Sequence, residues 1–164
     1  MENNEIVKSI EKEFDTIFET FEEIIDICPN ELWNKKCSGF IFWHQLVHAF
    51  SGTFFWLREE KPPFDKGING KNVVTELDAE YFDKEMILKE YYSKETVKEI
   101  CNETKESYKE WFYNKNDEWL KKLHYNKTTN FETTLGQIRH LMYHIGHCEA
   151  IFRENNIKTG EYKE

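Results

Sequence analysis

The chain has 164 residues, the length of one domain that builds its own hydrophobic core. Its formal net charge of −9 argues against direct nucleic-acid binding, because such binding depends on Lys and Arg that neutralise phosphates. Aromatic residues form 16% of the chain while only seven Gly and three Pro interrupt it, a balance that favours long helices.

The sequence carries no sign of export or of a membrane span. Its first residues, MENNEIVKSIEKEF, have neither a positively charged start nor an apolar stretch, so we expect no secretory signal. No apolar run reaches the roughly 18 residues that cross a bilayer. We therefore expect a cytoplasmic protein with no membrane partner, whose four scattered cysteines stay reduced in the core. These are Cys28, Cys37, Cys101 and Cys148.

Two long helices are predicted in the first third of the chain. Over residues 5–27, Ile, Val and Phe recur at gaps of three and four and form one apolar stripe, which Cys28-Pro29 ends. A second helix is predicted over about 39–60. It is apolar nearly all round, which is typical of a helix in the middle of a fold.

The remaining chain predicts two more long helices. Residues 61–76, rich in Pro and Gly, are predicted as the longest loop, and a short helix is predicted over 84–91. The third long helix is predicted over 93–113, after a polar N-cap, and the last over 133–155, with Thr134 and Gln137 as a capping box. We find no strand signal. Four long helices predict a single all-α domain, a helix bundle, over residues 1–164.

Five of the six histidines lie on two of these helices. His140, His144 and His147 are spaced at i, i+4 and i+7, within about 60° of one another around the last helix, and His44 and His48 are one turn apart on the second. A single histidine on an apolar face is usually a hydrogen-bonded core residue. Burying several without partners costs about 1–3 kcal/mol each, which a shared metal ion would relieve. A histidine core and a metal site are both compatible with this pattern.

Two segments around these histidines resemble a known family. FWHQLVHAFSGTFFWL on the second helix, followed far downstream by TTLGQIRHLMYHIGHCEAIFRE, is similar to the DinB/YfiT-like family of metalloenzymes. The similarity covers the whole chain in helix order and spacing, and its distinctive residues lie in these two segments. It implies an up-down-down-up four-helix bundle that holds a divalent metal ion on one histidine of the second helix and on an H-x-x-x-H pair of the last.

Carried over residue by residue, the resemblance implies His48, His140 and His144 as metal ligands. His44 lies one turn before His48 and is an alternative to it. His147 stands where many relatives carry Gln, so it is either a partner of a ligand or a fourth ligand. Zinc or nickel is favoured as the ion, and manganese or iron also suits imidazole.

Three neutral imidazoles with open coordination positions are typical of catalytic metal sites. The resemblance implies a metal-dependent transferase or isomerase that acts on a small molecule, with a low-molecular-weight thiol as co-substrate. Two alternatives are compatible with the sequence. One is a non-catalytic metal-binding or stress-response protein with a structural histidine cluster, and the other is a metal-free helical homodimer whose aromatic surface binds a partner.

Further side chains near the histidines are candidates for a role in catalysis. Glu149 is a candidate general base or an exposed helix residue. Arg139 and Arg153 are candidates to bind a substrate carboxylate or to pair with surface acids. Tyr143 and Trp43 adjoin the predicted ligands and either line a pocket or belong to the core. We assign no role to His124, the one histidine outside the two helices.

Overall fold

The computed structural model describes residues 4–37, 39–60 and 91–160. These residues are mostly helical, as predicted. The predicted loop over 61–76 and short helix over 84–91 lie outside the described residues. None of the helices in the described part combines the length and apolar character that crossing a bilayer requires.

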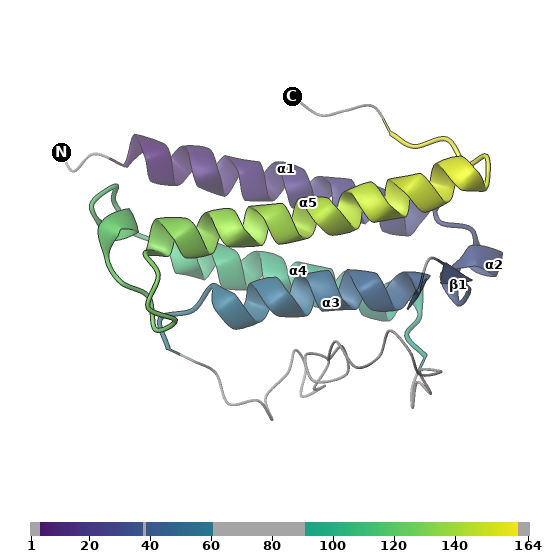
Figure 1. The fold of residues 1–164 in the computed structure, drawn as a ribbon, viewed down its shortest axis with the longest axis horizontal. Coiled ribbons are helices and arrows are strands. Elements are labelled where there is room, and N and C mark those ends of the chain that lie inside the picture. Colours follow the sequence, from purple (N-terminus) through teal and green to yellow (C-terminus); the bar gives the residue numbers. More distant parts are fainter. Residues whose placement is uncertain (1–3, 38, 61–90, 161–164) are drawn as a thin grey trace.

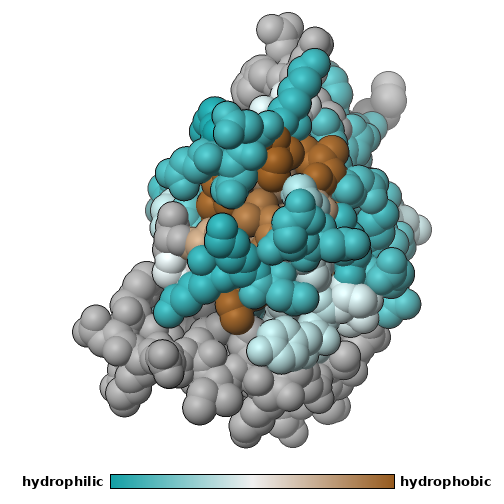
Figure 2. All heavy atoms as spheres, turned by 90° about the vertical axis from the view of Figure 1, so that its right-hand side faces the viewer, coloured by the Kyte–Doolittle hydropathy of each residue, from teal (hydrophilic) through white to brown (hydrophobic). Residues whose placement is uncertain are grey.

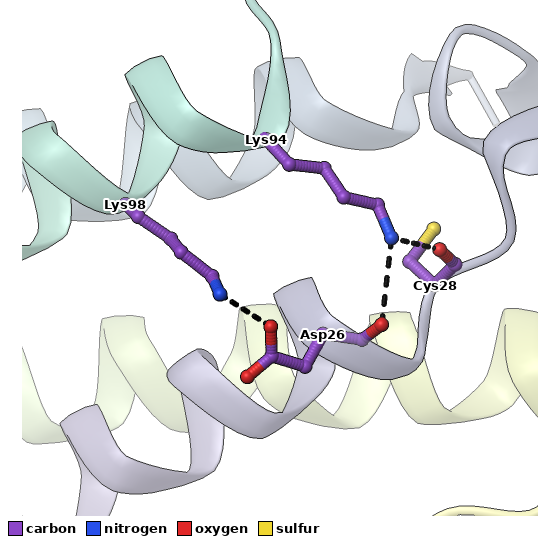
Figure 3. A network of polar contacts seen from close by, with 4 residues as sticks. All are labelled: Asp26, Cys28, Lys94 and Lys98. Atoms are coloured by element: carbon purple, nitrogen blue, oxygen red, sulfur yellow. Dashed lines mark hydrogen bonds and ion pairs between the residues drawn. The ribbon is translucent and has the colours of Figure 1, made fainter.

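The first helix, α1 (Glu5–Ile27), matches its prediction, and its apolar stripe is buried. The last carbonyls of α1 lack partners within the helix, and α4 (Lys94–Phe112) supplies cations to them. Lys94 donates from Nζ to the backbone oxygens of Asp26 and Cys28, and Lys98 pairs with the Asp26 carboxylate (Figure 3). These contacts join the end of α1 to the start of α4.

Between α1 and the second long helix the structure differs from the prediction. A short helix, α2 (Asn30–Trp33), is followed by two-residue strands β1 (Lys36–Cys37) and β2 (Phe40–Ile41), which pair antiparallel where no strand was predicted. The long helix α3 (Phe42–Trp56) is therefore shorter at both ends than the predicted 39–60. Gly39 has a φ of 97°, which a turn accepts and a helix excludes.

The ends of the other helices are set by polar caps. Ser93 Oγ accepts a hydrogen bond from the Thr96 amide and begins α4 as predicted. A short 3₁₀ helix, η3 (Trp119–Lys121), precedes α5 (Asn130–Glu154). The capping box of α5 is formed by Thr129 and Glu132, so the predicted box and the predicted start at 133 are wrong. Thr134 instead donates within the helix, to the Asn130 carbonyl at 2.7 Å.

The four long helices pack around one aromatic core. Both α1 and α3 contact α4 and α5, and the four lie side by side in Figure 1. Phe18 of α1 joins the helices, because its ring lies 5.6 Å from that of Phe50 on α3 and 5.1 Å from that of Tyr108 on α4. Figure 2 looks at the end that carries α2 and β1, where apolar residues show between hydrophilic ones. Most of the histidines lie where α3 packs against α5.

Candidate metal centre

Three of the predicted ligands meet where α3 packs against α5. His48 comes from α3, and His140 and His144 come from successive turns of α5. His48 and His140 are half-buried and His144 is buried, with 2% of its surface exposed. One ligand atom from each of the three lies within 4.8 Å of the other two. The structure thus brings together residues that are 92 positions apart in the chain.

The nitrogens that face each other are the Nε2 atoms. Nε2 of His140 lies 3.1 Å from Nε2 of His48 and 3.2 Å from Nε2 of His144. Metal–nitrogen bonds of about 2.0–2.1 Å at angles between octahedral and tetrahedral values place two ligand nitrogens roughly 2.8–3.4 Å apart. Both observed separations fall in this interval, so the donor set fits a divalent transition metal ion.

Hydrogen bonding alone does not account for this convergence. A neutral imidazole nitrogen has either one proton or one lone pair, so Nε2 of His140 can make one good hydrogen bond. It has two nitrogen neighbours at hydrogen-bonding distance, from His48 and His144. A shared cation would resolve this conflict, because all three lone pairs could then point at one centre.

Burial keeps these imidazoles in the form that binds metal. Desolvation, together with the neighbouring histidines, lowers the pKa of His48 to about 4 and that of His144 to about 2. Desolvation also lowers the pKa of His140. The three side chains are therefore neutral at pH 7, and a cation does not have to displace protons from them.

Gly52 makes room for one of these rings, and sequence reasoning missed it. It lies one turn after His48 on α3, beneath the ring of His140. A Cβ at this position would stand 2.8 Å from Cε1 of His140, closer than real Cβ contacts come, and 3.1 Å from Nδ1, tighter than most of them. The only sequence signal was a glycine inside an otherwise apolar helix, which often marks a close approach.

The other two histidines of these helices are not part of the group of three. His147 lies 2.6 Å through Nδ1 from Oε1 of Gln45, so Nδ1 carries the proton that the amide oxygen accepts. His44 is fully buried, neither of its ring nitrogens has a partner among the described residues, and desolvation lowers its pKa to about 4. The pair of Gln45 and His147 joins α3 to α5 one turn away from His48 and His144.

Most of the remaining candidate residues lie in the core or at the surface, outside the group of three histidines. Glu149 and Arg153 pair with each other at 3.4 Å across one turn of α5, and Arg139 is exposed. Trp43 is buried and stacks on Tyr92 with ring centroids 4.9 Å apart, so it belongs to the core. Tyr143 is 62% exposed, and its ring centroid lies 5.2 Å from that of His144. Tyr143 is therefore the one of these candidates that flanks the histidine group from the surface.

His124 and the cysteines lie outside the site. His124 is buried against Trp111, and its Nε2 lies 2.8 Å from the Arg58 carbonyl, which joins the chain before α5 to the end of α3. Burial raises the pKa of Cys28 and Cys101 to about 12 and raises that of Cys148. All four cysteines are free thiols, and Cys28, Cys101 and Cys148 are buried as predicted, whereas Cys37 is only half-buried.

The arrangement can hold one cation on three neutral nitrogen donors and leave coordination positions for other ligands. No carboxylate or thiolate among the described residues joins the group. A set of nitrogen donors alone suits a transition metal ion better than calcium or magnesium, which prefer oxygen ligands.

Comparison of the chain with models of protein families, with curated proteins and with solved structures finds no match.

Proposed function

We propose that His48, His140 and His144 bind one divalent transition metal ion, and that the protein is a metal-dependent enzyme of the DinB/YfiT-like type that acts on a small molecule. The convergence of the three Nε2 atoms, at 3.1 and 3.2 Å, is the observation that carries the proposal. The resemblance of the two histidine segments adds the reaction class, a transferase or isomerase that uses a low-molecular-weight thiol.

The same proposal includes the up-down-down-up four-helix bundle. It is supported by the course of the chain in Figure 1, in which α1 and α5 run in one direction and α3 and α4 in the other. The pairwise contacts of α1 and α3 with α4 and α5 are those of four helices at the corners of a square. In such a bundle, side chains of facing helices build metal sites in the core.

When bound, the ion would act as a Lewis acid and lower the pKa of a water or thiol that binds to it. The three histidines would hold it without adding charge, so its full positive charge stays available to the ligand. His48 and His140 are only half-buried, which supports access of a small molecule to the site. The bond of His147 to Gln45 supports an open site, because this ring is held by another partner.

Elemental analysis of protein made without a polyhistidine tag tests the metal site. We expect about one equivalent of zinc or nickel in the wild type and none in His48→Ala. His124→Gln is the matched control, since it removes a buried histidine away from the group, and it should keep the metal. A wild type without metal, even after incubation with zinc, nickel and manganese, would overturn the proposal.

The catalytic part needs a separate test. The metal-loaded wild type is assayed for transfer of glutathione and other small thiols to a panel of electrophiles, with His48→Ala as the control. We expect thiol consumption that depends on the metal. A stoichiometric metal site with no turnover across the panel would favour the non-catalytic alternative, a metal-binding or stress-response protein.

A further inference from the structure

A histidine that binds metal through Nε2 must carry its proton on Nδ1, and that N–H group needs an acceptor. Ligand histidines usually donate this proton to a carbonyl or carboxylate, which fixes the tautomer and the direction of the ring. Nε2 of His140 faces His48 and His144, so Nδ1 is on the far side of the ring. The far side lies over Gly52, where a Cβ would be 3.1 Å from Nδ1.

Gln137 presents a buried acceptor on this same side. It lies one turn before His140 on the same face of α5 and is 8% exposed. Its Oε1 is buried and has no hydrogen-bond partner among the described residues. This oxygen lies 3.9 Å from the point where a Cβ of Gly52 would stand, so Gln137 and His140 border one gap above the Gly52 backbone.

An unpaired buried oxygen is unfavourable, by about 1–3 kcal/mol, and is rare in proteins unless a function requires it. The Gln137 oxygen lacks a hydrogen-bond donor. The nearby imidazole of His140 carries such a donor on Nδ1 as soon as its Nε2 binds a cation. The absence of a side chain at Gly52 leaves the space between acceptor and donor free of a methyl group.

We propose that Gln137 is a positioning residue for the metal site, whose Oε1 accepts the hydrogen bond from Nδ1–H of His140 when the ion is bound. This inference rests on the proposed metal site. It means that the Nδ1–H group of His140 donates its hydrogen bond to the Gln137 side chain and not to water. Gln137 would thus select the tautomer of His140 that presents its Nε2 lone pair to the ion.

Two variants at this position separate positioning from packing. Gln137→Met keeps length and removes the acceptor, so zinc affinity, measured by competition with a chelator, should fall about 10–100-fold. The metal-free protein should be as stable as the wild type or more stable, because an unpaired buried oxygen is gone. Gln137→Glu restores an acceptor, and we expect it to recover wild-type zinc affinity or exceed it.

Gln45→Met is the matched control, because Gln45 is also a buried glutamine but is already hydrogen-bonded to His147. It should lower the stability of the metal-free protein while changing zinc affinity less than Gln137→Met does. A second readout is the Nδ1–H signal of His140 in the NMR spectrum of zinc-loaded, nitrogen-15-labelled protein. This proton should be protected from exchange in the wild type and should exchange rapidly in Gln137→Met.

The outcomes distinguish this inference from the proposed function. A wild type that binds no zinc would overturn both. A wild type that binds zinc, together with a Gln137→Met variant whose affinity and Nδ1–H protection are unchanged, would overturn the role of Gln137 alone. In that case the imidazole donates to water, and the metal site itself stands.

Discussion

Replacing Gly52 by alanine tests whether the ring of His140 lies against the α3 backbone. The added methyl group would stand 2.8 Å from Cε1 of His140, whereas carbon atoms in contact are about 3.5–4.0 Å apart. The ring must therefore move by roughly 0.7–1.2 Å, several times the tolerance of about 0.2 Å for a metal ligand. We expect zinc affinity to fall about 10–100-fold, comparable to the loss of a ligand's hydrogen-bond partner.

The stability of the metal-free Gly52→Ala protein should change much less. Alanine is favoured over glycine inside a helix by about 0.5–1 kcal/mol, and turning His140 away from its rotamer costs about 0.5–1.5 kcal/mol. These terms oppose each other, so we expect a net change within about 1 kcal/mol. The loss of affinity corresponds to about 1.4–2.7 kcal/mol and should appear only when metal is present.

Thermal unfolding with and without zinc, together with chelator competition, measures both quantities. Gly146→Ala is the matched control, because Gly146 lies on α5 between His144 and His147 and a Cβ there meets no atom within 4 Å. That variant should gain about 0.5–1 kcal/mol from helix propensity and keep its affinity. If Gly52→Ala binds zinc as tightly as the wild type, the close approach of His140 to α3 is refuted.

Two further predictions concern the histidines. His140→Ala and His144→Ala should each lose the metal and remain folded with lower stability. Elemental analysis measures the metal content and circular dichroism the folding and stability. Wild-type metal content in both variants would refute the ligand assignment. Burial lowers the pKa of His44 to about 4 and of His144 to about 2, from 6.5, so the unfolded chain takes up protons first. The free energy of unfolding of the metal-free protein should therefore decrease as the pH falls from 6.5 towards 4, by about 1 kcal/mol per pH unit for each fully buried histidine. Urea unfolding at pH 7 and pH 5 measures this, and equal stability at both would contradict the burial of these rings.

The sequence alone predicted the long helices and the shared face of His140 and His144, because each depends on the periodicity of one helix, whereas the choice of His48 over His44 came from the resemblance. The apolar stripe of α1 and the spacing of His140 and His144 follow from 3.6 residues per turn. Helix ends were predicted less well. Gly39 was assigned to a helix but takes a turn conformation, and the cap of α5 is at Thr129, since each depends on which local hydrogen bonds the folded chain makes.

The surroundings of the histidines were decided by the tertiary structure. Which face of α3 meets which turn of α5 depends on how the two helices slide and rotate as their side chains interlock, and neither helix encodes this by itself. That packing places Gly52 under His140, turns His147 to Gln45 and leaves Gln137 with a buried, unpaired oxygen. None of these relations follows from spacing along the chain, because each joins atoms of two helices that come together only when the core is packed.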